Sequence, residues 1–396
     1  MIKPIPYGRQ NITDQDINAV VEVLKSDFLT QGPKIIDLEN KFSNYVGSKY
    51  SVAVSNGTAA LHLCSMAMNV KPGDKVITTP ITFSASANCI RYCGGEIVFG
   101  DIDPETYLLD INSVRELLKS SPSGTYKGII PVDFAGRAVN LEQFRNLADE
   151  YGLWIIEDSC HSPGGYFTKK NGEKSKCGSA EFADLAIFSF HPVKHIASGE
   201  GGMITTNNKL IYERLLKLRS HGIVKNNNMY KNSIEFANGN NESTDFPNWY
   251  MEMQELGYNY RLSDIQAALA ISQLERADEG LKRRREIAKI YKDEFFDCSF
   301  IKGQSGYNIG HAYHLYIIQV KNRLELYNYL RDNNVYTQIH YIPVHLMPYY
   351  RNLGWKEGDR PKSEEYYKNC ISLPMFPSLS NDQLMYVIKL VKGFYS

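Results

Sequence analysis

The chain has 396 residues, of which 43% are hydrophobic and 22% are charged. This length exceeds what one simple core needs, so we expect two domains in one globular subunit. Lys and Arg together number 44, as do Asp and Glu, so the formal net charge is zero and no overall field favours nucleic acid or an anionic membrane.

Targeting and redox signals point to the cytoplasm. No stretch approaches the ~20 apolar residues of a membrane helix, and the first residues lack the apolar core of a signal peptide. The seven cysteines show no metal-knuckle spacing, which favours reduced thiols and no metal. Cys160 and His161 could form a metal pair, but no second pair stands at ligand spacing.

Strand-like and helix-like segments alternate along most of the chain. A capping box at Thr13 and Asp16 predicts a first helix, which continues to Leu24. Short apolar runs predict seven strands at 50–54, 75–79, 96–99, 128–132, 153–157, 185–188 and 202–205. Amphipathic segments between them, such as 141–151 and 209–219, predict helices. The expected fold is therefore α/β, with a mainly parallel seven-stranded sheet and helices on both faces.

The rest of the chain predicts a smaller C-terminal α/β domain. Residues 263–296 read as one long helix, whose basic run 282–285 would be a solvated face. After it we expect a strand, a helix, a strand and a helix, at 312–320, 323–332, 335–340 and 382–394. The predicted domains are 1–295, in which residues 1–30 contribute to a substrate site, and 296–396.

The asparagine-rich segment 226–248 breaks this alternation. Its polarity cannot bury a core, so it should be a loop. Two interpretations stay open, a tolerated surface insertion and an active-site flap.

Two sites follow predicted strands. Gly57 and Thr58 lie where a strand turns into a helix, so backbone N–H groups and the positive end of the helix dipole could bind a phosphate; a plain connection is the alternative. Asp158 follows the strand 153–157, where it could accept a hydrogen bond from a protonated pyridine nitrogen. Its alternative role is a helix N-cap.

The third site is Lys194, which lies between a strand and the glycine-rich run that ends at Gly202. A free lysine has a pKa of about 10.4 and is a poor nucleophile at neutral pH. As an imine with a cofactor aldehyde it is activated, and once released it can move protons. Ser189 could bind the cofactor phosphate. Together the three sites predict a pyridoxal 5′-phosphate (PLP) enzyme with Lys194 as its catalytic residue, rather than a lysine in a glycine-rich hairpin.

In this order and spacing the sites resemble the sugar aminotransferases of the DegT–StrS family, which are PLP enzymes of fold type I. The resemblance covers nearly the whole chain and rests on motifs that begin at Ser55, Pro80, Glu157, Ser189 and Gly257. It implies a homodimer with shared active sites, L-glutamate as the amino donor and pyridoxamine phosphate as an intermediate.

The same resemblance implies roles for individual residues. The cofactor would be bound by Gly57, Thr58, Phe83, Asp158, His161, Ser189 and Asn259, with the ring of Phe83 stacked on it. Asn259 would reach the cofactor phosphate of the neighbouring subunit. Arg261 is a candidate for binding a substrate carboxylate or phosphate, and a structural salt bridge is its alternative role.

In the stretches 6–10, 26–33, 219–222 and 340–345 the chain resembles the aminotransferases of pseudaminic acid biosynthesis, which act at C4 of a UDP-linked 4-keto-6-deoxy-N-acetyl sugar. The similarity implies a substrate site formed by Tyr7, Asp27, Phe28, Leu29, Thr30, His340, Tyr341, Ile342 and Pro343.

Three alternatives stay open. One is another nucleotide-sugar aminotransferase, acting at C3 or on a dTDP or GDP sugar. A PLP sugar dehydratase would carry histidine in place of Lys194. A PLP-binding regulatory protein should carry a DNA-binding domain, and the sequence predicts none.

Overall fold

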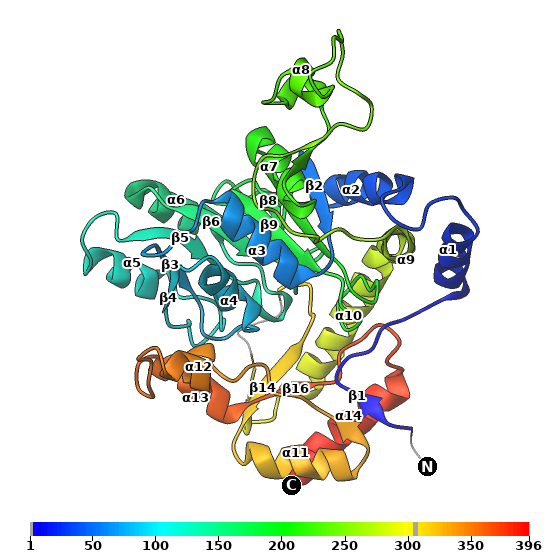
Figure 1. Ribbon diagram of the computed structural model, residues 1–396. Coiled ribbons are helices and arrows are strands. Elements are labelled where there is room, and N and C mark those ends of the chain that lie inside the picture. Colours follow the sequence, from blue (N-terminus) through cyan, green and yellow to red (C-terminus); the bar gives the residue numbers. More distant parts are fainter. Residues whose placement is uncertain (1–2, 304–307, 396) are drawn as a thin grey trace.

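The computed structural model describes residues 3–303 and 308–395. Residues 1–2, 304–307 and 396 of the two predicted domains lie outside this description. The chain forms a large α/β body around a seven-stranded sheet and a smaller body around a three-stranded sheet (Figure 1). Both chain ends lie at the smaller body.

The large sheet has the strand order β2-β10-β9-β6-β5-β3-β4. Its strands are β2 (Tyr50–Val54), β3 (Lys75–Thr78), β4 (Glu96–Phe99), β5 (Tyr126–Ile130), β6 (Trp154–Asp158), β9 (Leu185–Ser189) and β10 (Gly202–Thr206). Within it, β10 runs antiparallel to both neighbours, and the other pairs are parallel. This confirms the predicted fold class, and each predicted strand is present within two residues of its expected bounds.

Helices cover both faces of this sheet, because its strands are buried on both sides. They are α2 (Pro33–Val46), α3 (Gly57–Ala67), α4 (Ala85–Tyr92), α5 (Ile111–Lys119), α6 (Leu141–Tyr151) and α7 (Lys209–Arg219). Val52 and Val54 of β2 pack in the cluster that contains α3, α4 and α7, whereas Ala53 packs in the cluster that contains α2. Helices α6 and α7 have their predicted bounds.

Helix α1 (Asp14–Leu24) begins at the predicted capping box, in which the Thr13 N–H and hydroxyl donate to the Asp16 carboxylate. Val23 is buried where α1 packs on the rest of the chain, but other apolar side chains of the helix face outward. Ile17 and Leu24 are 52% and 55% exposed. The prediction of the helix was correct, and its exposed apolar side chains are a surface that this chain alone does not cover.

The prediction of one long helix over 263–296 was wrong. The chain forms α9 (Asp264–Glu275) and α10 (Ala277–Glu294), and Arg276 between them has φ −114° and ψ 16°. The Arg276 guanidinium donates to the Asn11 carbonyl and to the Asp16 carboxylate. The break therefore lies where α1 is tied to the helix pair, a contact that local periodicity does not report.

The basic run 282–285 is only in part the solvated face that was predicted, since Lys282 is exposed but Arg284 is not. Arg284 is only 2% exposed, and its Nη1 donates to the carbonyls of Tyr313, His314 and Met375. These carbonyls belong to the segments that lead into and out of the smaller sheet. Arg284 is buried because α10 packs against those segments.

The smaller body contains β13 (Ile301–Gly303), β14 (Tyr316–Val320), β16 (Cys370–Leu373), α11 (Arg323–Asp332), α12 (Pro348–Arg351), α13 (Pro361–Asn369) and α14 (Asn381–Phe394). A short pair, β1 (Ile5–Pro6) and β15 (Val335–Tyr336), adds the N-terminal segment to it. The strands predicted at 312–320 and 335–340 are shorter than expected, and β16 and α13 were not predicted. Ile5 packs in the core of this body, and the domain boundary at residue 295 stays a prediction.

The asparagine-rich segment projects from the large body at the top of Figure 1. It contains the short turns η2 (Asn227–Met229) and α8 (Ile234–Ala237), between β11 (Ile223–Val224) and β12 (Glu252–Met253), which pair antiparallel. The Glu252 carboxylate accepts hydrogen bonds from the N–H groups of Lys231 and Asn232. Most of the segment is irregular, as its composition predicts.

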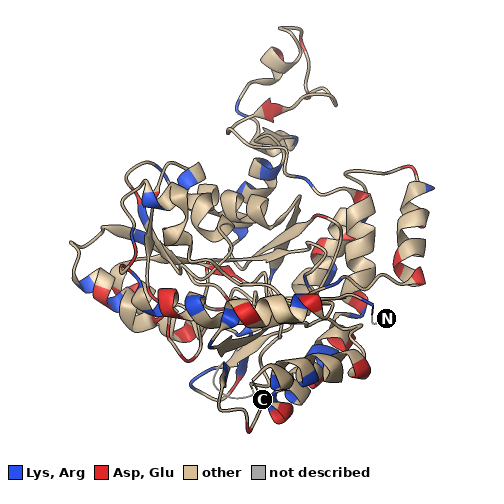
Figure 2. Cartoon of the chain, turned by 90° about the horizontal axis from the view of Figure 1, so that it is seen from below, with Lys and Arg blue, Asp and Glu red and all other residues tan. Residues whose placement is uncertain are grey.

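Surface and redox features agree with the composition. Figure 2 shows blue and red residues interspersed, as the zero net charge leads us to expect. All seven cysteines are free. Across residues 3–303 and 308–395, no helix combines the length and the apolar character needed to cross a membrane.

Candidate active site

A cavity of about 890 Å³ opens at the carboxyl ends of β6 and β9, beside the N-terminus of α3. Parallel α/β sheets place their ligand sites at this edge. Ten of the residues predicted from the sequence line the cavity: Tyr7, Gly57, Thr58, Phe83, Asp158, His161, Ser189, Lys194, His340 and Tyr341. The chain therefore brings the three predicted sites together.

Lys194 lies in the loop after β9, where its backbone N–H donates to the His191 carbonyl at 2.8 Å. Burial lowers the pKa of the Lys194 ammonium, and the charge of Arg284 lowers it further against the opposing effects of Cys160 and Asp158. More of this lysine is consequently present as the free amine near neutral pH than for a lysine in water.

Asp158 ends β6 and is 5% exposed. Its Oδ2 accepts a hydrogen bond from the Ser86 hydroxyl at 2.7 Å, and its Oδ1 accepts one from the Cys160 N–H at 3.2 Å. These two donors fix the carboxylate toward the cavity. Ser86 was not predicted from the sequence, although it follows closely on the family motif that begins at Pro80.

The start of α3 faces the end of β9. Asn56 caps the helix, since its side chain accepts from the Ala59 N–H at 2.8 Å. A Cβ on Gly57 would lie 3.0 Å from the Ser189 Cβ, so a larger residue would crowd Ser189. The first turn of a helix leaves backbone N–H groups unpaired. Gly57, Thr58 and Ser189 thus form a compact cup that suits a phosphate.

His161 is buried at the opposite wall. Its Nδ1 accepts from the Ala135 N–H at 3.2 Å, which leaves the hydrogen on Nε2, 3.3 Å from the Tyr341 hydroxyl. Burial lowers the pKa of His161 well below its ordinary value, and the Lys194 charge adds to this effect. His161 therefore stays a neutral hydrogen-bonding ring.

Aromatic side chains complete the walls. Phe83 is 61% exposed, and its ring centroid lies 6.4 Å from that of Tyr341. Tyr7 and His340 are in ring contact at 5.1 Å. Phe83 is free to contact a flat ligand, as its predicted stacking role requires.

Eight predicted site residues lie outside the cavity lining: Asp27, Phe28, Leu29, Thr30, Asn259, Arg261, Ile342 and Pro343. Segment 27–30 is exposed and runs beside the start of α9, where the Leu29 carbonyl accepts from the Asp264 N–H. Asn259 is exposed and pairs with Ser220 in an isolated bridge. Arg261 makes no ion pair with the described residues, so the structural salt bridge that was its alternative role is not seen among them.

Several lining residues were not predicted. His62 Nδ1 lies 3.2 Å from the Tyr260 hydroxyl, and the rings of Tyr258 and Tyr260 stack with centroids 4.9 Å apart. Tyr258 and Tyr260 flank Asn259 in the family motif that begins at Gly257, so this motif could have predicted them. No motif in the sequence pointed to His62, because its position depends on contact between α3 and a segment almost 200 residues away.

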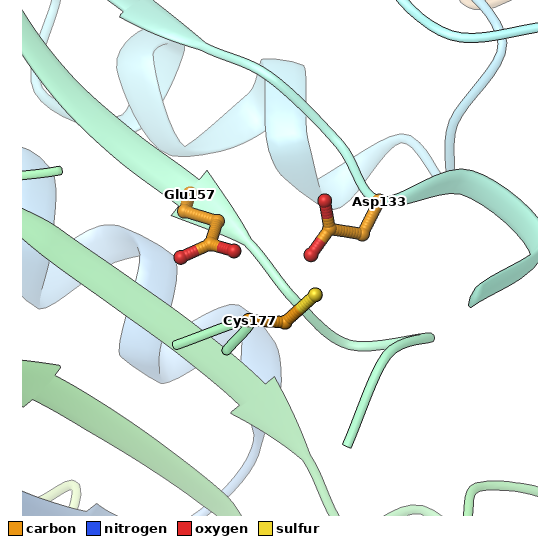
Figure 3. Close-up of side chains that lie close together, drawn as sticks. All are labelled: Asp133, Glu157 and Cys177. Atoms are coloured by element: carbon orange, nitrogen blue, oxygen red, sulfur yellow. The ribbon is translucent and has the colours of Figure 1, made fainter. Parts of the chain in front are cut away.

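Behind Asp158, three side chains point toward one another: Asp133, Glu157 and Cys177 (Figure 3). Neighbouring residues of a strand point to opposite faces, which places Glu157 away from the cavity. Ser162 donates to Asp133 at 2.6 Å and the Gly178 N–H donates to Glu157 at 3.0 Å. Burial and the charge of Asp133 raise the pKa of Glu157 well above its ordinary value. We interpret the cluster as two carboxyl groups that share a proton.

A sequence model of the DegT/DnrJ/EryC1/StrS aminotransferase family matches residues 10–392. The chain belongs to this family. The family match confirms the predicted family and enzyme class, an aminotransferase, over nearly the whole chain.

Curated members of the DegT/DnrJ/EryC1/StrS family align with almost all of the chain. The spore coat polysaccharide biosynthesis protein SpsC of Bacillus subtilis is 37% identical, over 98% of this chain and 96% of its own length. GDP-perosamine synthase of Escherichia coli O157:H7 is 33% identical over 100% of both chains. UDP-4-amino-4,6-dideoxy-N-acetyl-beta-L-altrosamine transaminase of Campylobacter jejuni is 33% identical over 99% of both.

Solved structures of the family agree. PseC of Helicobacter pylori, an aminotransferase involved in the biosynthesis of pseudoaminic acid, superposes with a TM-score of 0.86 at 27% identity, over 99% of this chain and 100% of its own. The putative sugar aminotransferase Spr1654 of Streptococcus pneumoniae, in its PLP form, superposes with a TM-score of 0.84 at 27% identity, over 98% of each chain.

Proposed function

We propose that this sugar aminotransferase moves an amino group from L-glutamate to C4 of a UDP-linked 4-keto-6-deoxy-N-acetylhexose, a step of pseudaminic acid biosynthesis. The observation that carries the proposal is the meeting of Lys194, Asp158 and the Gly57–Ser189 cup in one cavity. The relatives that support the sugar are the Campylobacter transaminase and PseC.

The cofactor is PLP, as the sequence predicts. The related Spr1654 is known in a PLP form and in a PMP form. The cavity fits this group, because the cup formed by Gly57, Thr58 and Ser189 would hold the phosphate, Asp158 the pyridine nitrogen and Lys194 the aldehyde carbon. When bound, the cofactor supplies an electron sink that stabilises negative charge on a substrate carbon.

Lys194 would act both as nucleophile and as proton carrier. Its lowered pKa favours the free amine, which is the form that attacks a carbonyl carbon and that accepts a proton. Lys194 would take a proton from the α-carbon of glutamate and, in the second half of the reaction, deliver one to C4 of the sugar. Because it acts from one face, it fixes the configuration at C4.

The neighbouring residues would hold the reacting parts in place. Ser86 and the Cys160 N–H orient the carboxylate of Asp158, so that it can accept a hydrogen bond from a pyridinium nitrogen. His161 and Tyr341 form a neutral hydrogen-bonded pair beside Lys194. A neutral pair adds no charge that would compete with Asp158 for the nitrogen.

Both the substrate part of the site and the phosphate cup would be completed by a second copy of the chain. Segment 27–30 and Asn259 are exposed outside the cavity, and the apolar side chains of Ile17, Leu24 and Phe28 are about half exposed beside them on the N-terminal segment. We therefore propose a homodimer in which Asn259 of one copy reaches the cup of the other. The protein would work without nucleic acid or membrane partners.

The test is turnover with glutamate on the UDP-linked 4-keto sugar, with NMR assignment of the aminated carbon. We expect a C4 amine and release of 2-oxoglutarate. The similarity to GDP-perosamine synthase makes a GDP-linked keto sugar the second candidate, to be assayed in parallel. Amination of the GDP sugar alone would overturn the pseudaminic assignment and leave the enzyme a sugar aminotransferase.

A further inference from the structure

A second cavity, of about 190 Å³, also opens onto Lys194. Arg9, Arg276 and Arg284 line it, and Glu279 is the one acidic side chain among its described lining residues. The active-site cavity differs, because no arginine is among its described lining residues and Lys194 is its one lysine. The positive charge near Lys194 is therefore concentrated in the second cavity.

Arg284 is the buried charge of this cavity. All three of its hydrogen bonds use Nη1 and end on uncharged carbonyls, those of Tyr313, His314 and Met375. Its Nε and Nη2 make no hydrogen bond to any described residue, and no described carboxylate lies within ion-pair distance. Burial lowers the pKa of Arg284 to about 9, and no acid opposes that effect. A buried cation without a counter-charge is unfavourable unless an anion joins it.

The other two arginines add to this charge. Arg9 is exposed and makes no side-chain hydrogen bond or ion pair with residues 3–303 or 308–395. Arg276 is paired with Asp16 through Nη2, while its Nε is buried without a partner. Glu279 is exposed to solvent, where its charge is screened. The cavity thus offers free guanidinium donors, which suit the planar oxygens of a carboxylate.

We propose that this cavity binds the side-chain carboxylate of the amino donor, with Arg284 and Arg9 as its ligands. The inference rests on the proposed function, which requires a dicarboxylic amino donor. The amino group of the donor must reach the neighbourhood of Lys194, and its side-chain carboxylate lies two methylene groups beyond the α-carbon. Lys194 lines both cavities, so the second cavity lies beside the place where the amino group of the donor has to react.

The variant Arg9→Gln tests the site on the holoenzyme, because Arg9 is exposed and its replacement leaves the fold intact. The first half-reaction is followed by cofactor absorbance with L-glutamate and with L-alanine, which lacks the second carboxylate. We expect the glutamate concentration that half-saturates this half-reaction to rise about tenfold, with its limiting rate within about twofold, and the reaction with alanine to be unchanged. The matched control is Arg115→Gln on α5, whose weak contact with Glu150 at 3.9 Å lies on the surface, and we expect no change.

A binding measurement gives a second readout. Calorimetric titration of the holoenzyme with glutarate should show binding that Arg9→Gln weakens about tenfold, while butyrate binds more weakly. Arg284→Gln should weaken glutarate binding more; if it does not fold, Arg9→Gln still decides.

Three other results would overturn the site, the donor assignment or the proposed function. An unchanged half-saturating glutamate concentration and an unchanged glutarate affinity in Arg9→Gln would overturn the site. Inorganic phosphate that competes as well as glutarate would identify a general anion site and overturn the donor assignment. Failure of the wild-type enzyme to aminate any keto sugar would refute the proposed function, whereas the glutarate titration would still judge the cavity.

Discussion

The cavity around Lys194 and the exposed segments assigned to the same site differ in how the chain builds them. Asp158 and Ser189 end neighbouring buried strands, and Ser86 and the Cys160 N–H hold the Asp158 carboxylate. Segment 27–30 and Asn259 lie at the surface, outside the cavity lining. One chain thus brings Lys194, Asp158 and the cup together, and leaves outside the cavity lining both segment 27–30, predicted for the sugar, and Asn259, predicted for the cofactor phosphate.

The difference separates residues that one chain positions by itself from residues that need a partner to cover them. Strand ends are fixed by the hydrogen bonds of the sheet, so their side chains hold a position without help from a partner. Surface segments gain a defined environment only when something covers them. Substitutions at the residues around Lys194 should lower turnover. Mixing two variant chains should show whether the exposed Asn259 acts in the site of a partner.

The largest effect is expected for Lys194→Ala. Loss of the nucleophile and proton carrier should lower turnover by about 10⁴-fold or more, while the fold is retained. Steady-state turnover with glutamate and the keto sugar measures this. Lys119→Ala, at the exposed end of α5, is the matched control and should behave as wild type. Near-normal turnover of Lys194→Ala would refute the assignment.

Asp158→Asn should lower kcat by roughly 10²- to 10³-fold, because an amide cannot keep the pyridine nitrogen protonated. Ser86→Ala should cost less, roughly 3- to 10-fold, since Ser86 only orients Asp158. The order of the two losses of kcat tests the roles of the two residues. A larger loss for Ser86→Ala than for Asp158→Asn would contradict the roles given to the two residues.

Mixing inactive chains tests the exposed group. If Asn259 acts in the partner's site, a mixture of Lys194→Ala and Asn259→Ala chains forms mixed dimers with one intact site each, and about a quarter of wild-type activity returns. The two variants are co-refolded or co-expressed and assayed. If Asn259 acts within its own chain, activity stays at the level of the separate variants.

The carboxyl pair behind Asp158 should matter for stability rather than for chemistry. Glu157→Ala leaves Asp133 buried without its partner and should cost roughly 2–4 kcal/mol of unfolding free energy, whereas Glu157→Gln keeps a donor and should cost roughly 1 kcal/mol or less. Because the pKa of Glu157 is raised in the folded state, its contribution is complete below its unfolded pKa of 4.5 and is lost as pH rises through the folded value. Urea unfolding at several pH values measures both effects, and equal costs for the two variants would contradict the shared proton.

A change in the pH dependence of stability is expected for the buried His340. Burial lowers the pKa of His340 to about 3, from an ordinary value of 6.5. Between these values the unfolded chain binds a proton that the folded chain does not, so stability falls as pH falls below 6.5, by about 1.4 kcal/mol per pH unit. His340→Gln should flatten the slope by this amount.

The sequence by itself determined the α/β fold, seven strands and the bounds of α6, α7 and α11, and it predicted candidate sites at Gly57, Asp158 and Lys194, which line one cavity. These follow from local chemistry, because apolar runs, caps and strand-end motifs carry their meaning within a few residues. The resemblance to a known family extended this to the enzyme class and the cofactor.

Only the tertiary structure decided the break at Arg276, the burial of Arg284 and the placement of His62 and Ser86 beside the site. Each depends on a contact between residues far apart in the chain, such as that of Arg276 with Asp16 or of His62 with Tyr260. Periodicity and motifs do not report such contacts, because the energy that fixes them comes from burial and hydrogen bonding between separate elements.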